Sequence, residues 1–443
     1  MKTARQLALD VLCRVESEGA YSAIAFDRTA RKSGLSERDV SFAAAVFYGV
    51  LERRITLDFM LSPYLKKRIS SLDCAVRNIL RMGAYELCYM DAAPDRAAVN
   101  EAVSLARYAK KSSAGSLINA VLRSLIRDGK PLKLPDRKAD PMRYLSVKYG
   151  CPEWIVGQWT AQYGEEDAEG LVESSVSRPP LYARVNTLKT SADALAALLR
   201  EQGVQVKKHS WLENCLILSK TGSIEAISAY RNGLFYIQDL SSQLCAQALS
   251  ARPGDTVLDI CAAPGSKSFT AAQMMENSGK IFAFDLYEHK CRLIADGAKR
   301  LGISIIKTAI RDGANDCGEL PMADRILCDV PCSGLGILRR KPEIRFKAEE
   351  ELSGLPALQY RILENAARFL KPGGTLIYST CTTNREENEK VVERFLSENS
   401  WAAPLQFAGG FDTIETIGNF MATLLPQKTG SDGFFFASMT KKK

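Results

Sequence analysis

Two cysteines, Cys332 and Cys381, are the side chains of this chain best suited to nucleophilic chemistry. Each follows an apolar run with the character of a buried strand, Arg325–Val330 before the first and Thr375–Ser379 before the second. A cysteine at the end of a strand lies in a loop, where its thiolate can attack an electrophilic carbon. We therefore expect these two thiols to be reactive.

The other cysteines and the histidines indicate no further chemistry. The chain has 443 residues and twelve cysteines, but no C-x-x-C pair of the kind that forms a zinc ribbon or a thioredoxin-like site. We expect the remaining cysteines to be small buried side chains. The two histidines, His209 and His289, lie in polar surroundings and give no support to a Ser-His-Asp or Cys-His hydrolase. No metal site is predicted.

Acidic residues follow three successive predicted strands. Asp285 comes 26 residues after Asp259, and Asp312 follows the next strand. At such positions a carboxylate can accept hydrogen bonds from ribose hydroxyls. The loop Asp259–Lys267 is neither a dinucleotide fingerprint nor a phosphate loop, because Cys261 and Ser266 stand where a phosphate loop has glycines. The acids that follow successive strands around this Pro-Gly loop favour a ligand that contains adenosine. The backbone N–H groups of the loop and Lys267 suit a carboxylate.

The second half of the chain predicts an α/β fold with a doubly wound sheet. Apolar runs separated by helical segments are typical of parallel βαβ units, whose ligands bind at the carboxyl ends of the strands. A later run, Gly433–Met439, predicts an edge strand. The runs are Thr256–Cys261, Lys280–Leu286, Ile303–Ile310, Arg325–Val330 and Thr375–Ser379.

Residues 1–135 predict an all-helical domain. Apolar residues recur at helical spacing, and Ser36-x-x-Asp39 has the pattern of a helix N-cap. A linker is expected at Asp128–Pro131. Further helices are expected at Cys74–Met90, Arg96–Tyr108 and Ser116–Arg127.

Residues 136–250 predict a small α+β connector domain, and residues 251–443 the domain with the doubly wound sheet. In the connector we expect a helix around Trp154–Tyr163, a strand at Leu181–Asn186 and a helix at Ala192–Gln202. Short strands follow as far as Gln238. The chain thus divides into three predicted domains.

The positive charge of the chain is concentrated in its first third. Residues 1–150 hold 26 Lys or Arg and 16 Asp or Glu, whereas residues 151–443 hold 33 and 35. This is the distribution expected where one domain docks on a polyanion and another performs chemistry. No apolar run approaches the roughly 18 residues that span a bilayer, and no signal-peptide core is present, so we expect a cytoplasmic protein.

Several motifs resemble known families. Pro94–Val103 and Ile118–Arg123 resemble the NusB family of RNA-binding helical domains. Cys261–Lys267, Asp329–Gly336 and Ser379–Thr382 resemble three motifs of the S-adenosylmethionine-dependent RNA cytosine-C5 methyltransferases. With the NusB-like part first and the three motifs in this order, the whole chain resembles the bacterial 16S rRNA methyltransferases of the RsmB (Sun/Fmu) type. One departure is Ser266, where that family usually has glycine.

The resemblance implies a site that binds S-adenosyl-L-methionine and the target base. It assigns to Asp329 the orientation of the cytosine through its Watson–Crick edge. The residues that it places around the cofactor are Cys261, Ala262, Ala263, Pro264, Gly265, Ser266, Lys267, Asp285, Asp312 and Asp329.

The implied chemistry needs a cysteine nucleophile. C5 of cytosine is a weak nucleophile, and attack of a thiolate on C6 turns the ring into an enamine that accepts a methyl group. The resemblance assigns this attack to Cys381 and assigns release of the product to Cys332. Lys267 either orients Asp329 or lowers the pKa of a thiol, and the sequence leaves both roles open.

The implied substrate is one cytosine of 16S rRNA, free or partly assembled, and the protein is expected to act as a monomer. The basic stretch after Cys332 includes Arg339, Arg340 and Lys341, which we expect to bind RNA phosphates. Two alternatives remain open. One is a cytosine-C5 methyltransferase that acts on transfer RNA, and the other is a noncatalytic RNA-binding assembly factor that retains the fold.

Overall fold

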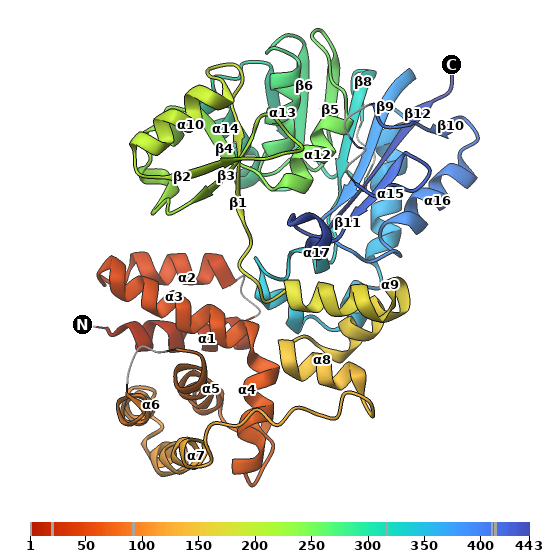
Figure 1. Ribbon diagram of the computed structural model, residues 1–443. Coiled ribbons are helices and arrows are strands. Elements are labelled where there is room, and N and C mark those ends of the chain that lie inside the picture. Colours follow the sequence, from red (N-terminus) through yellow and green to blue (C-terminus); the bar gives the residue numbers. More distant parts are fainter. Residues whose placement is uncertain (1, 19–21, 91–93, 316–317, 409–410, 412–413) are drawn as a thin grey trace. The chain divides into compact units, whose positions relative to one another are not determined.

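The computed structural model describes residues 2–18, 22–90, 94–315, 318–408, 411 and 414–443. The chain forms two compact units (Figure 1). Unit 1 comprises Met1–Ser177 with Leu338–Lys347, and unit 2 comprises Arg178–Ile337 with Ala348–Lys443. Among the described residues, no helix is long and apolar enough to cross a membrane.

Unit 1 consists of helices around one apolar core, as the sequence predicts. Ser36 caps the N-terminus of a helix, where its Oγ accepts a hydrogen bond from the backbone N–H of Asp39 at 3.2 Å. Leu12, Phe47 and Leu122 are among the side chains that the helices bury at 3.6-residue spacing. The helices are α1 (Ala4–Glu18), α2 (Ser22–Arg31), α3 (Glu37–Glu52), α4 (Arg54–Leu61), α5 (Cys74–Tyr89), α6 (Asp95–Tyr108), α7 (Gly115–Arg127), α8 (Pro141–Tyr149) and α9 (Glu153–Ser174).

Helices α8 and α9 belong to unit 1, although we expected residues 136–177 in the connector. Gly164 has φ +83°, so the helical path of α9 is broken there. The break explains why the sequence pattern predicted a helix only as far as Tyr163. The division of the chain into three domains stays a prediction.

Unit 2 begins with a small antiparallel sheet, which confirms the predicted α+β connector. The sheet order is β2-β3-β1-β4, with α10 (Ala192–Glu201) between β1 and β2 and α11 (Ser228–Arg231) before β4 in the chain. Its strands are β1 (Leu181–Val185), β2 (Gln205–Lys208), β3 (Cys215–Ser219) and β4 (Phe235–Ile237).

The larger sheet of unit 2 is doubly wound, as predicted, and carries the strands whose loops concern the chemistry. Its order is β10-β12-β9-β8-β5-β6-β7, and the five strands β9-β8-β5-β6-β7 are parallel. The strands are β5 (Thr256–Asp259), β6 (Lys280–Asp285), β7 (Ile306–Ile310), β8 (Ala323–Asp329), β9 (Leu370–Thr380), β10 (Ala402–Pro404), β11 (Met421–Leu424) and β12 (Phe434–Lys441).

Both faces of this sheet are buried, since neighbouring residues of one strand enter different cores. Val257 belongs to one apolar cluster and Leu258 to the other. Parallel strands covered on both faces are apolar throughout, which is why they were visible in the sequence. The covering helices are α12 (Leu240–Ala248), α13 (Ser266–Met274), α14 (Glu288–Leu301), α15 (Leu355–Ala367) and α16 (Glu389–Glu398), and a short helix α17 (Pro426–Thr429) precedes β12.

The predicted edge position of Gly433–Met439 is wrong. Strand β12 pairs with β9 on one side and with β10 and β11 on the other, and all of these pairings are antiparallel. Phe435, Phe436 and Ala437 are completely buried. An uninterrupted apolar run fills both faces of a strand, and such a strand belongs in the interior of a sheet rather than at its edge.

A close backbone contact anchors the loop after β8 to the start of β12. The N–H of Gly433 donates to the carbonyl of Gly336 at 2.8 Å. A Cβ on Gly336 would lie 1.9 Å from the carbonyl oxygen of Gly433, which is backbone and cannot turn away. Glycine is therefore required at position 336.

Gly336→Ala is expected to destabilise unit 2 by about 1–3 kcal/mol, and in a domain of about 150–250 residues each kcal/mol lowers Tm by about 2–4 °C. Gly354→Ala is the matched control, because Gly354 has φ −82° and its added Cβ meets no atom within 4 Å. Thermal unfolding followed by circular dichroism measures both. Equal Tm values for the two variants would contradict the proposed contact.

Candidate active site

The two predicted cysteines lie side by side at one edge of the larger sheet. Cys332 follows β8 and Cys381 follows β9, and these strands are parallel neighbours with Asp329 paired to Ser379. The two Sγ atoms are 3.2 Å apart. This distance exceeds a disulfide bond of about 2.05 Å, so both residues are thiols and one S–H donates to the other sulfur.

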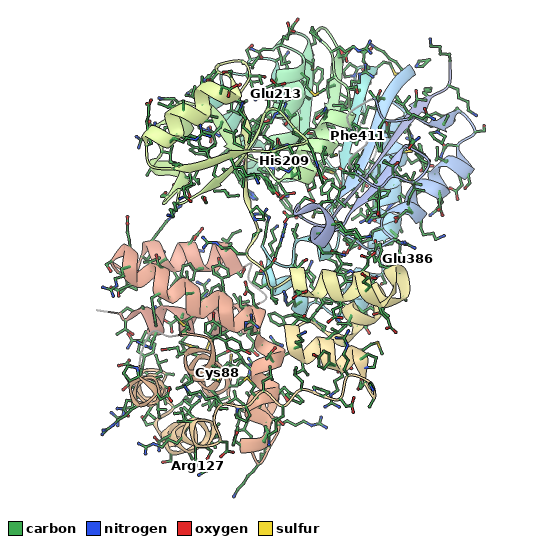
Figure 2. All side chains as sticks on the ribbon, in the orientation of Figure 1. Cys88, Arg127, His209, Glu213, Glu386 and Phe411 are labelled. Carbon is green, nitrogen blue, oxygen red and sulfur yellow. The ribbon has the colours of Figure 1, made fainter. Side chains whose placement is uncertain are left out.

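The pKa of Cys332 is raised well above that of an ordinary thiol. The hydrogen bond with Cys381 is the main cause, followed by burial and by the negative charges of Glu387 and Asp329. Cys332 therefore holds its proton. By contrast, Cys88 on α5, labelled in Figure 2, has its pKa raised to about 11 mainly by burial and lies outside this arrangement.

Asp329 forms a partly buried ion pair with Lys267. The Nζ of Lys267 donates to Oδ2 of Asp329 at 2.6 Å, and Ser379 Oγ donates to Oδ1 at 2.9 Å. Burial, the largest single cause, lowers the pKa of Lys267, but the charge and hydrogen bond of Asp329 together with the charges of Cys245 and Asp259 outweigh it, and the pKa is raised. Lys267 is thus a fixed cation. Of its two possible roles, the contact supports the orientation of Asp329.

The loop between β5 and α13 lies next to this ion pair in the sequence and ends at a helix N-terminus. Gly265 has φ +104°, and a Cβ there would meet the ring of Phe269 at 2.6 Å, so glycine is required. Ser266 begins α13 and has no left-handed φ. Serine therefore fits the backbone at position 266.

The other two predicted acids end neighbouring strands. Asp285, at the end of β6, is 6% exposed and accepts from the backbone N–H of Ala263 at 3.3 Å. Asp312, just after β7, is exposed and accepts from the N–H of Ala314 at 2.9 Å. Strand order β8-β5-β6-β7 places these acids and Asp329 at the same edge of the sheet, as the sequence predicted.

Asp259, at the end of β5, is a buried acid whose environment the sequence did not reveal. Burial raises its pKa to about 7. Its Oδ2 accepts a hydrogen bond from Ser268 Oγ at 2.6 Å, whereas Oδ1 has no partner. An acid that ends an apolar strand run is the sequence signal for such a site.

Sequence reasoning also missed Ser379 and Glu387. Ser379 was placed in a motif but was given no role of its own. In the structure, its hydroxyl group donates a hydrogen bond to Asp329. Glu387 is completely buried and contacts the Cys332 loop. One feature of the sequence could have pointed to Glu387. It lies in Thr382–Asn388, a segment of polar residues that directly follows Cys381.

The basic stretch after the Cys332 loop packs into unit 1. Glu343 accepts from Ser22 Oγ at 2.6 Å, and Arg345, which is 1% exposed, donates to the carbonyl of Ser175 at 2.6 Å. Arg339 is buried, Arg340 is partly exposed and Lys341 is exposed. Binding of phosphate by these three residues stays a prediction, and Lys341 has the most accessible side chain for it.

The histidines lie apart from the thiols. His209, labelled in Figure 2, follows β2 of the small sheet, and its Nδ1 accepts from the backbone N–H of Trp211 at 3.2 Å. Burial and Lys207 lower its pKa. Within the described part of the chain, no group of three or more His, Cys, Asp or Glu side chains is arranged to hold a metal ion.

Three family models match successive parts of the chain. The model of the NusB family matches residues 2–127. A ferredoxin-like domain of RsmF/B-like methyltransferases matches residues 151–225, and 16S rRNA methyltransferase RsmB/F matches residues 246–440. The last match contains all the motifs of the candidate site.

Curated relatives match the chain over its whole length. "Probable ribosomal RNA small subunit methyltransferase B" of Bacillus subtilis (strain 168) is 36% identical over 446 residues, which is 99% of each chain. The protein of Sodalis glossinidius named ribosomal RNA small subunit methyltransferase B is 32% identical over 92% of this chain and 91% of its own. This chain belongs to the ribosomal RNA small subunit methyltransferase B family. The predicted family, NusB-like front end and methyltransferase class are confirmed.

Solved structures agree with this family assignment. The crystal structure of PH0851 covers 100% of this chain and 99% of its own, with a TM-score of 0.82 and 25% identity. A methyltransferase homolog protein from Pyrococcus horikoshii covers 68% of this chain and 99% of its own, with a TM-score of 0.59 and 30% identity. The whole chain therefore shares its fold with one solved structure, and about two thirds of it with a methyltransferase homolog.

Proposed function

We propose that this chain transfers a methyl group from S-adenosyl-L-methionine to C5 of one cytosine in 16S rRNA. The observation that supports this most strongly is the pair of thiols 3.2 Å apart beside the Lys267–Asp329 ion pair. A cysteine nucleophile is a chemical requirement of cytosine-C5 alkylation. The names of the family and of its curated members support the ribosomal substrate.

In this proposal, Cys381 attacks C6 of the flipped cytosine and Cys332 assists release. Attack places an electron pair on the enamine, so that C5 becomes nucleophilic and accepts the methyl group. The C5 proton then passes to a base or to water with the assistance of Cys332, and the C–H electron pair expels the Cys381 thiolate and restores the aromatic ring. Asp329, held by Lys267 and Ser379, accepts a hydrogen bond from the exocyclic amino group on the Watson–Crick edge and so orients the base.

The residues at the ends of β6 and β7 fit the proposed methyl donor. This donor supplies an electrophilic methyl group. Asp285 is the register partner of Ile310 on the neighbouring strand. Ile310 and Leu286 are 55% and 49% exposed, which is unusual for large apolar residues at strand ends. They offer an apolar surface for a heterocyclic ring, and Asp285 and Asp312 offer acceptors for its sugar or amino groups.

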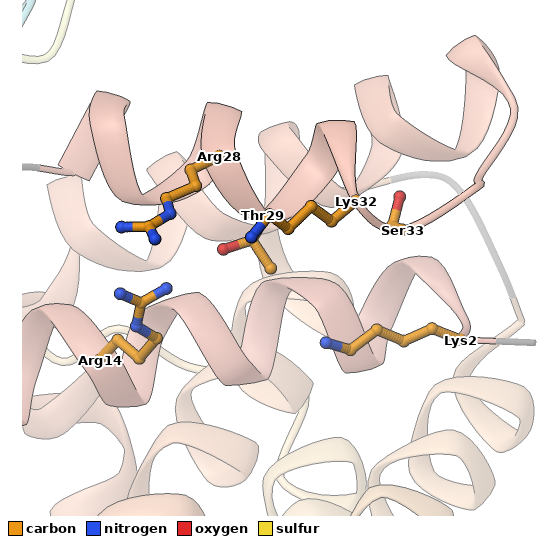
Figure 3. Close-up of a pocket in the computed structure, with 6 residues that line it drawn as sticks. All are labelled: Lys2, Arg14, Arg28, Thr29, Lys32 and Ser33. Carbon is orange, nitrogen blue, oxygen red and sulfur yellow. The ribbon is translucent and has the colours of Figure 1, made fainter.

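Unit 1 offers a basic groove for the RNA backbone. Figure 3 shows Arg14 of α1 and Arg28 of α2 pointing toward one another across a pocket of about 430 Å³. The other residues that line it are Lys2, Thr29, Lys32 and Ser33. None of the described residues that line this groove is acidic, but Lys2 pairs with Asp10 and Arg14 pairs with Glu18. The other two lining cations, Arg28 and Lys32, are therefore the ones offered to phosphate groups. We place the enzyme in the cytoplasm, where it acts as a monomer on free or partly assembled 16S rRNA.

The proposed groove predicts a change in the salt dependence of RNA binding. Arg28→Glu with Lys32→Glu is expected to weaken binding and to reduce the slope of log affinity against log salt by about 1.4, because each lost phosphate contact on single-stranded RNA contributes about 0.7. Lys390→Glu with Arg394→Glu is the matched control, since those cations on α16 already pair with Glu393 and Glu398. Fluorescence anisotropy at several salt concentrations measures both variants. An unchanged slope in the first variant would refute the groove.

The proposed reaction predicts transfer of labelled methyl groups to unmodified 16S rRNA and not to bulk transfer RNA. Cys381→Ala is expected to lower the rate by at least about 1,000-fold, because the residue removed is the nucleophile. Bisulfite sequencing locates the methylated cytosine. Label on transfer RNA would overturn the substrate and leave the chemistry standing. Absence of transfer to either RNA, with the methyl donor bound, would favour a noncatalytic assembly factor.

A further inference from the structure

A completely buried carboxylate, Glu387, anchors the loop that carries Cys332. Its Oε2 accepts from the backbone N–H of Ser333 at 2.8 Å and from Gln359 Nε2 at 2.9 Å. Its Oε1 accepts from Asn384 Nδ2 at 3.1 Å. No cation is among these partners, so Glu387 is held as a buried negative charge by neutral donors alone.

The same cluster fixes both neighbours of Cys332. Gln359 also donates to the carbonyl of Pro331 at 3.0 Å, so that the residues before and after Cys332 are both tied to the Glu387–Gln359 pair. The hydroxyl groups of Ser333 and Thr382 are 2.8 Å apart and link this loop to the residue after Cys381. The two sulfur atoms therefore have little freedom to separate.

We propose that Glu387 is a positioning residue that holds Cys332 against Cys381 and whose buried charge adds to the hydrogen bond and the burial that keep Cys332 a neutral thiol. The thiol of Cys332 then donates its hydrogen to the sulfur of Cys381, which ionises first and becomes the nucleophile. The inference deepens the proposed function and rests on it.

The charges around the thiols are consistent with this assignment. The groups that face Cys332 are Cys381, Glu387, Asp329 and Tyr378, and Asp329 is neutralised in part by Lys267. The hydrogen bond with Cys381, burial and the acids all raise the pKa of Cys332. Two thiols in contact lose their protons in two separated steps, because the first thiolate repels the second.

The test measures alkylation of each thiol by iodoacetamide in the full-length protein without RNA, at several pH values, with mass spectrometry of the two peptides. In the wild type, Cys381 is expected to react at least about tenfold faster than Cys332 near neutral pH. Glu387→Gln removes the charge and keeps the shape. It is expected to speed alkylation of Cys332 by about tenfold at a given pH, which corresponds to one pKa unit.

Glu389→Gln is the matched control for loss of a buried carboxylate in the same segment. Glu389 is 6% exposed and accepts from Thr423 Oγ1 at 2.9 Å, and it is not among the groups that act on Cys332. This variant is expected to keep the wild-type ratio of the two alkylation rates. Glu387→Gln with the wild-type Tm and the wild-type ratio would overturn the inference.

Gln359→Met tests the positioning role and decides the question if Glu387→Gln does not fold. It removes the donor to Pro331 and to Glu387 Oε2, while the carboxylate keeps the N–H of Ser333 and Asn384 as partners. Methyl transfer is expected to show kcat lowered by at least about tenfold with KM unchanged, since the loop is misplaced while binding is intact. Wild-type kcat would refute the positioning role. Because alkylation requires neither RNA nor methyl donor, failure of the proposed function alone would leave the alkylation ratio unchanged.

Discussion

The parallel pairing of β8 with β9 is the constraint on which the candidate site depends. This pairing sets Asp329 opposite Ser379, and the chain then continues on each strand into a loop that carries a cysteine. Carboxyl ends of parallel strands meet at one edge of a sheet, so two motifs that are distant in sequence supply one pair of thiols. The buried neighbours β5 and β12 keep these central strands in register.

Around the thiols, each acidic side chain has a different kind of partner. Asp329 is balanced by the ammonium group of Lys267, whereas Glu387 is held by an N–H group and two amide side chains. Asp259 has one oxygen without a partner, and burial raises its pKa to about 7. Charged groups with such different partners near the two thiols give the sulfur atoms different environments, which is what distinct roles require.

Much of this fold could be predicted from local pattern. The apolar runs located β5, β6, β8 and β9, because strands buried on both faces are apolar throughout, and Ser36 located a helix start by its capping chemistry. Once these strands were predicted, the loops of the site could be predicted too, because ligands of such a sheet bind at the carboxyl ends of its strands. The placement of β12 depends on pairing across the whole domain, which no local pattern encodes.

The polar partners of the site were also beyond local reasoning. Glu387 contacts Ser333, 54 residues away in the sequence, and Gln359, 28 residues away. Likewise, the stretch Leu338–Lys347 has the composition of an open basic loop, yet Glu343 and Arg345 bind residues of unit 1 that are 321 and 170 positions distant. Such contacts form only when the chain folds. A single sequence shows which types of residue are present but not which of them will pair.

The central claim is that the sulfur of Cys381 forms the covalent bond to the cytosine. The most direct measurement is to incubate Cys332→Ala with unmodified 16S rRNA and S-adenosyl-L-methionine, digest the stalled complex with nuclease and trypsin, and sequence the modified peptide by mass spectrometry. Our account predicts one cytidine nucleotide, methylated at C5, on the peptide at Cys381. A nucleotide on another cysteine would contradict it, as would turnover by Cys332→Ala at the wild-type rate with no trapped complex.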